Sequence, residues 1–117
     1  MAVNNIKYYK FLIQNFGNIQ YIGCKALAYI LANYNDQDLK DLYKEYAQKI
    51  GSTPVAVERS VRTYLSVIED TYTIEDLSKF LNYSFKPGQT KLTIKDFVIL
   101  FKMYIDVLEE EQPLEQQ

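Results

Sequence analysis

Two arginines, Arg59 and Arg62, stand three residues apart, and they are the only arginines among the 13 Lys and Arg residues of the chain. The guanidinium of arginine is a planar fork of N–H donors that can bond guanine O6 and N7 together, whereas the single ammonium of lysine cannot. Glu58 directly precedes Arg59, and a carboxylate can accept a hydrogen bond from cytosine N4. These residue types in this order predict the reading of DNA bases.

Segment 54–70 is predicted to be one amphipathic helix that holds these side chains. At about 100° per residue, its apolar residues share one face: Val57, Val61, Tyr64, Leu65 and Ile68. The opposite face and its edges carry the candidate DNA-contacting residues: Val55, Glu58, Arg59, Arg62, Thr63 and Ser66. Both arginines are therefore expected to point away from the core.

The residues before this helix match the spacing of a helix-turn-helix over about 39–70. Ala47 is followed by Gly51 four residues later and by Val57 after six more. A small residue lets two helices approach, a glycine makes the sharp turn, and an apolar residue buries the second helix against the first. The outer face of the second helix of such a unit enters the major groove of DNA.

The whole chain has helical hydrophobic periodicity and no segment of period 2. Six helices are predicted, over about 4–16, 19–34, 39–50, 54–70, 74–82 and 94–110. The first of them is expected to bury Ile6, Tyr9, Ile13 and Phe16. The predicted fold class is all-α, a single compact bundle of about six helices over residues 1–110, followed by an acidic, frayed tail at 111–117.

Local signals set the ends of these helices. Gly17 and Gly51 stand where a helix commonly ends in a left-handed residue. Thr53 before Pro54 is a strong start, because threonine can cap a free amide and proline has no amide to satisfy. Further capping or turn signals are Asn35-Asp36, the pair Thr73 and Asp76, and the pair Thr93 and Asp96.

Length and composition indicate one domain with a real core, since 48% of the 117 residues are hydrophobic. The longest apolar run, 26–32, is too short to span a bilayer, and no secretory signal begins the chain. A single Cys cannot form an internal disulfide, and a cytoplasmic location is expected. Five of the 15 acidic residues but no basic residue lie in 103–117, so residues 1–102 are mildly basic and suit an anionic partner.

Catalysis, a metal site and a cofactor are not expected. The chain has no His, which is the commonest acid–base residue and a common zinc ligand. Cys24 lies in an apolar segment and is expected to be a packed thiol. The acidic pairs at 69–70 and 75–76 fit a solvated turn and first-turn charges that suit the helix dipole.

Four short motifs resemble those of one family over nearly the whole chain. Leu42-Tyr43-x-x-Tyr46-Ala47 resembles Leu-Tyr-Pro-x-Ile-Ala, and Val57-Glu58-Arg59-x-Val61-Arg62 resembles Val-Glu-Arg-Ala-Ile-Arg, the most specific match. Leu81-Asn82-Tyr83-Ser84 resembles Phe-Gly-Tyr-Thr, and Lys91-x-Thr93-x-x-Asp96-Phe97 resembles Lys-Pro-Thr-Asn-Ser-Glu-Phe. The chain thus resembles the C-terminal DNA-binding effector domain of the sporulation initiation regulator, stage zero protein A.

The resemblance implies an all-helical domain that binds double-stranded DNA and regulates transcription without catalysis. It implies that Glu58 and Arg59 read bases in the major groove of an operator like TGTCGAA, and that Arg62 lies against the DNA. In the loop at 83–92, Lys86 and Lys91 are implied to reach backbone phosphates. Because one recognition helix covers only a few base pairs, binding as a homodimer or tandem pair is expected.

The chain departs from the family pattern at several positions. Ala56 stands where the family has Arg, and Thr63 where it has His, so two DNA contacts are missing; Lys44 replaces Pro. The receiver domain that precedes this module in the family is not expected here, because the first helix occupies residues 1–16. Phosphorylation-driven dimerisation is therefore not expected.

Three alternatives stay open for the arginine face. The spacing pattern occurs by chance in helical proteins, with the arginines merely solvated, and Glu58 and Arg62, at i and i+4, can simply pair. The domain can also be a protein-interaction module that pairs with or titrates a full-length regulator, or contacts RNA polymerase, without binding DNA. Replacement of Arg59 by Ala separates these hypotheses, because it abolishes specific DNA binding but leaves protein pairing intact.

Overall fold

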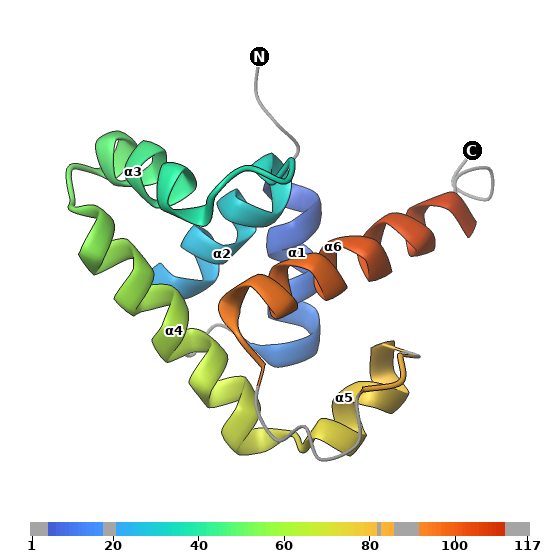
Figure 1. Cartoon of the computed structure of the whole chain (residues 1–117). Helices are drawn as coiled ribbons and strands as arrows, with labels where there is room; N and C mark the ends of the chain where they lie inside the picture. The colour runs from blue at the N-terminus through green and yellow to red at the C-terminus, as the bar shows by residue number, and fades with distance from the viewer. Residues whose placement is uncertain (1–4, 18–20, 82, 86–91, 112–117) are drawn as a thin grey trace.

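The computed structural model describes residues 5–17, 21–81, 83–85 and 92–111 of the chain. These residues form six α-helices and no strand, which confirms the all-α prediction (Figure 1). The helices are α1 (Asn5–Phe16), α2 (Tyr21–Asn33), α3 (Leu39–Ile50), α4 (Pro54–Thr71), α5 (Ile74–Leu81) and α6 (Ile94–Glu111). The predicted ranges agree with these bounds to within two residues. Most of the predicted acidic tail, residues 112–117, lies outside the described residues.

Three of the predicted caps, at Thr53, Thr73 and Thr93, are present at the starts of helices. The Thr53 hydroxyl accepts a hydrogen bond from the Ala56 amide at 3.2 Å, at the start of α4. In the two capping boxes, each Thr hydroxyl accepts from an Asp amide while the Asp carboxylate accepts from the Thr amide, in the pairs Thr73–Asp76 and Thr93–Asp96. These local bonds satisfy amides that have no partner within the helix.

The predicted cap at Asn35-Asp36 was wrong. Asp36 has a left-handed backbone with φ of 65° and lies in the turn, whereas Asp38 caps α3 by accepting from the Lys40 amide at 3.0 Å. Asp38 has the extended backbone, φ −63° and ψ 133°, that a capping residue needs. The later of the two aspartates therefore caps α3, because only Asp38 has the backbone conformation that a cap needs.

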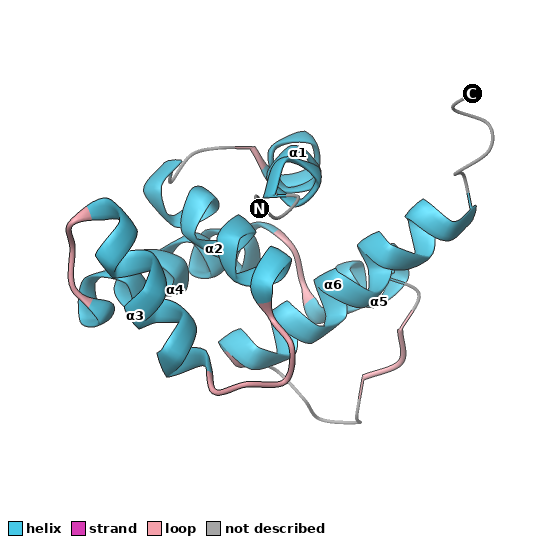
Figure 2. Cartoon of the chain, turned by 90° about the horizontal axis from the view of Figure 1, so that it is seen from above, coloured by secondary structure: helices cyan, strands magenta, loops and turns pink. Residues whose placement is uncertain are grey.

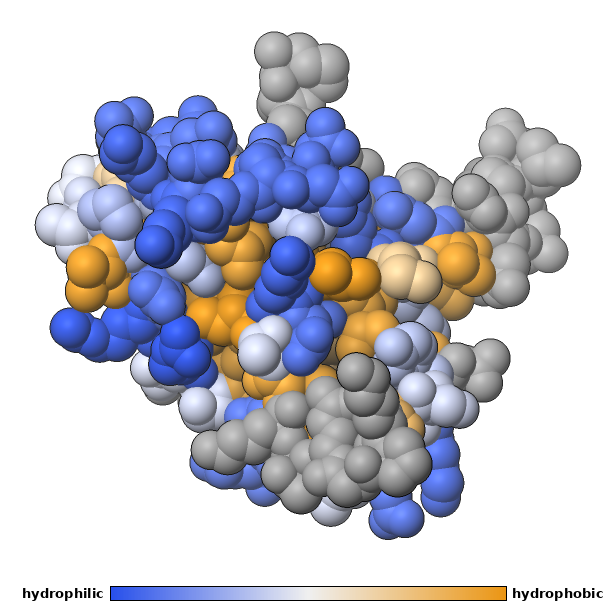
Figure 3. Space-filling view, viewed as in Figure 1, coloured by the Kyte–Doolittle hydropathy of each residue, from blue (hydrophilic) through white to orange (hydrophobic). Residues whose placement is uncertain are grey.

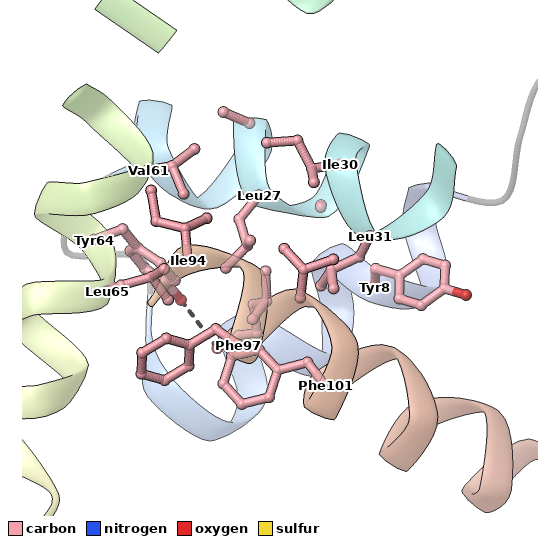
Figure 4. Packing of buried hydrophobic residues seen from close by; sticks show 14 of the residues in the cluster. Tyr8, Leu27, Ile30, Leu31, Val61, Tyr64, Leu65, Ile94, Phe97 and Phe101 are labelled. Atoms are coloured by element: carbon pink, nitrogen blue, oxygen red, sulfur yellow. Dashed lines mark hydrogen bonds between the residues drawn. The ribbon is translucent and has the colours of Figure 1, made fainter. Parts of the chain in front are cut away.

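Helix α2 lies at the centre of the bundle and contacts α1, α3, α4 and α6. Leu27, Ile30 and Leu31 of α2 are fully buried. They pack with side chains that α4 and α6 send into the same space, among them Val61, Tyr64, Phe97 and Phe101 (Figure 4). This core fixes where α4 lies, and through α4 it fixes the face that carries the arginines.

The face of α1 that is buried differs from the predicted one. Ile6 is 67% exposed, while Tyr8, Phe11 and Leu12 are buried; Tyr9, Ile13 and Phe16 are only partly buried. The ring centroids of Phe11 and of Phe16 lie 5.9 Å and 5.6 Å from that of Phe101 on α6, so residues of both overlapping apolar stripes reach α6. The sequence of α1 alone does not distinguish them.

The α3–α4 pair lies at one end of the molecule, and the last turns of α6 extend away from the bundle at the other (Figures 1 and 2). In the space-filling view, polar side chains cover α3, whereas apolar side chains reach the surface along α6 (Figure 3). Met103 and Val107 of α6 are 55% and 49% exposed. The two ends therefore present surfaces of different character.

Candidate nucleic-acid interface

The turn between α3 and α4 has the geometry that the sequence spacing predicts. Gly51 adopts a left-handed backbone, φ 69° and ψ 41°, and its amide bonds the Ala47 carbonyl. The Ser52 amide bonds the same carbonyl at 2.9 Å. Ala47 and Val57 are almost fully buried where the two helices meet. Ala47, Gly51 and Val57 thus have the roles in this turn that their spacing predicts.

The predicted DNA-contacting residues lie together on the outward face of α4. Val55, Arg59, Arg62, Thr63 and Ser66 are exposed, and Glu58 is half-buried at the edge of this face. We call this set, Val55, Glu58, Arg59, Arg62, Thr63 and Ser66, the outer face of α4. Lys86 and Lys91, expected at phosphates, lie outside the described residues.

The two arginines of the outer face are in different states. Arg62 Nη2 lies 2.7 Å from Glu58 Oε2, one helical turn away. Arg59 makes no hydrogen bond or ion pair with the described residues. The i, i+4 pair that the sequence left as an alternative is therefore formed, and Arg59 is the cation available to a partner.

Tyr43 of α3 lies beside the Glu58–Arg62 pair and is buried. Burial raises the pKa of Tyr43 to about 12; the Glu58 charge adds to this rise and the Arg62 charge opposes it. Both charges of the pair therefore act on this hydroxyl of α3. Arg59 lies about 100° further round α4 than Glu58.

Gly23 determines how closely α2 and α4 approach, although it was not among the residues predicted from the sequence. A Cβ atom added there would collide with the Ser60 carbonyl oxygen and would lie 2.9 Å from Tyr64 Cβ. Only glycine permits this crossing without a shift of α4. The sequence signal was a glycine inside an otherwise apolar helical segment, where it is unfavourable unless packing requires it.

Tyr64 was predicted as part of the apolar stripe, but its hydroxyl also has a specific role. It donates to the Gly17 carbonyl at 2.9 Å, which joins α4 to the end of α1. Burial, and then its hydrogen bond with Cys24, raise the pKa of Tyr64. Burial also raises the pKa of the Cys24 thiol, which is fully buried and matches the expected packed cysteine.

The described part of the chain offers neither a metal-ligand cluster nor a membrane-spanning helix. No group of three or more His, Cys, Asp or Glu residues there is arranged to hold a metal ion. None of the described helices has the length and apolar composition needed to cross a membrane. The outer face of α4 is the surface on which predicted binding residues converge.

A short turn joins α3 to α4, and α4 is packed on one side and polar on the other, so the molecule is a helix-turn-helix domain of the all-α class. The family model described as "Sporulation initiation factor Spo0A C terminal" matches residues 17–105. This range holds α2 to α5 and most of α6, and the chain belongs to this family of DNA-binding regulatory domains. The searches of curated proteins and of solved structures found no match.

Proposed function

We propose that this protein is a sequence-specific regulator of transcription that reads double-stranded DNA in the major groove with α4. The observation that carries this proposal is Arg59, an exposed arginine without a partner in the described structure, near the N-terminal end of α4. That end of a recognition helix normally meets the base edges. A free guanidinium there can bond guanine O6 and N7 without first breaking an ion pair.

Glu58 is proposed as the second base-reading residue. Its carboxylate can accept a hydrogen bond from cytosine N4, and it repels a base that offers only an acceptor at the same place. Val55 can contact a thymine methyl group, and the hydroxyls of Thr63 and Ser66 can bond a base or a phosphate. The expected operator is TGTCGAA-like, and two copies of the domain are proposed to bind it as a homodimer or tandem pair.

The test is fluorescence anisotropy with a labelled duplex that carries two TGTCGAA sites and with a scrambled duplex, each at low and near-physiological salt. We expect Arg59→Ala to lower the ratio of specific to scrambled affinity on the order of tenfold or more. Lys79→Ala is the matched control, because Lys79 is an exposed cation on α5. Equal affinities of the wild type for both duplexes, at both salt concentrations, would refute the base-reading proposal.

A protein-interaction role is the second candidate, favoured by a hollow of about 470 Å³ between α5 and α6. Its lining is mainly apolar and includes Tyr83, Met103, Tyr104 and Val107. The candidate partner is a full-length regulator of the same family, with which this domain would pair. Pairing with that regulator, unchanged in Arg59→Ala and without any DNA, would support this role.

A further inference from the structure

The two oxygens of the Glu58 carboxylate have different surroundings. Oε2 accepts the hydrogen bond from Arg62 Nη2 at 2.7 Å, and no described residue bonds Oε1. A carboxylate offers about four lone-pair sites. Glu58 can therefore accept a further hydrogen bond at Oε1 while it keeps Arg62.

A lone carboxylate is electrostatically unfavourable in the major groove, because phosphates line both sides of it. The cost is greater where water is displaced, since charges then interact in a lower dielectric. Arg62 offsets this cost if it remains on Glu58, because the pair carries no net charge. The side chain of Arg62 is 62% exposed and that of Glu58 42%, so neither is committed to the protein core.

Buried side chains set the orientation of the helix that carries the pair. Val61 and Leu65 of α4 are buried in the core, and the buried Tyr43 of α3 is affected by both charges of the pair. One helical turn separates Arg62 from Glu58, on the side of Glu58 away from the N-terminal end of α4. The Arg62 guanidinium thus reaches the Glu58 carboxylate from the C-terminal side, away from the end of α4 that is proposed to meet the bases.

We propose that Arg62 is a positioning residue, which holds and neutralises the Glu58 carboxylate so that Glu58 can accept from a cytosine amino group. This inference rests on the proposed function and assigns different tasks to the two arginines. Arg59 contacts the DNA directly, and Arg62 sets sequence preference through Glu58. Arg62 then determines which base pair the domain prefers, and contributes less to its affinity for DNA of any sequence.

The test uses the same anisotropy assay with the TGTCGAA duplex and with duplexes in which each G·C pair is replaced in turn by A·T. The variants are Glu58→Gln, Arg62→Gln and the double variant, with Lys79→Gln as the control for loss of a distant exposed cation. We expect Glu58→Gln and Arg62→Gln to lose discrimination at the same G·C pair, on the order of tenfold. The double variant is expected to be no worse than either single variant, since the two residues act as one unit.

Other results would overturn this inference. If Arg62→Gln weakens binding to every duplex equally and reduces the slope of log affinity against log salt by about 1, Arg62 contacts a phosphate. If Arg62→Gln changes preference at a pair that Glu58→Gln leaves unaffected, Arg62 reads a base by itself. If the wild type binds every duplex with the same affinity, the proposed function is refuted, and this inference is refuted with it. Far-UV circular dichroism and the unfolding midpoint of each variant show that the fold is retained.

Discussion

The α3–α4 end of the molecule and the α5–α6 end are held in different ways. Five side chains of α4 are buried, and Tyr64 adds a hydrogen bond to the end of α1. Helix α5 buries only Leu77 and Leu81, and Phe80 joins it to the bundle through ring contacts. Helix α4 is thus held by five buried side chains and a hydrogen bond, whereas α5 buries two side chains and adds the ring contacts of Phe80.

The largest expected effect comes from removing Tyr64, the residue that anchors α4. We expect Tyr64→Ala to lower the free energy of unfolding by about 4 kcal/mol, because it leaves a cavity in the core and removes a buried hydrogen bond. Phe80→Ala, at the other end, is expected to cost about 2 kcal/mol, since Phe80 is half-buried and lies against Phe11, Phe16 and Tyr104. Urea denaturation measures both values.

Equal losses of unfolding free energy in Tyr64→Ala and Phe80→Ala, or a larger loss in Phe80→Ala, would contradict the difference between the two ends. A second measurement sharpens it: the folded fraction of Phe80→Ala should bind the TGTCGAA duplex like the wild type, since α5 does not position α4. Tyr64→Phe separates the two parts of the Tyr64 effect, because it keeps the ring and loses only the hydroxyl.

Alkaline pH should lower the free energy of unfolding through Tyr43, which lies at the α3–α4 end. Its folded pKa is about 12, above the ordinary value of 10.0, so the unfolded chain loses this proton first as the pH rises. The contribution of Tyr43 to the free energy of unfolding is therefore fully present below about pH 10. It falls between about pH 10 and 12, by up to about 1.4 kcal/mol per pH unit. Urea denaturation across this range should show a steeper decline for the wild type than for Tyr43→Phe, and parallel declines would contradict the prediction.

The smallest expected effect concerns two helix caps of the same type. Thr53→Ala and Thr73→Ala should each cost about 1 kcal/mol, because each leaves a first-turn amide of α4 or α5 uncapped. Only Thr53→Ala should also weaken DNA binding, since it loosens the turn that holds the N-terminal end of the outer face. An equal loss of DNA affinity in Thr73→Ala would show that the two ends are coupled.

Much of the candidate site could be predicted from the sequence. The phase of α4 follows from the spacing of Val57, Val61 and Ile68, and it placed both arginines outward. The i, i+4 spacing of Glu58 and Arg62 permits an ion pair, but the sequence did not show whether the two side chains bond or stay separate. Which arginine is tethered and which is free became clear only from the structure.

Other features depended on contacts that have no local signal. The prediction for α1 was wrong at Ile6, which is exposed, because the bundle buries Tyr8, Phe11 and Leu12 instead. The close approach at Gly23 needs α4 to cross α2 at Ser60. No residue near Gly23 in sequence indicates that crossing.

Local sequence was enough to predict the helical class, most helix ends and the outward direction of Arg59, because hydrophobic period and capping bonds act within about four residues along the chain. The tertiary structure alone decided which stripe of α1 is buried, why Gly23 must be small, and that the Tyr64 hydroxyl reaches Gly17. Those contacts join residues far apart in the chain, and only the packing of whole helices around α2 brings them together.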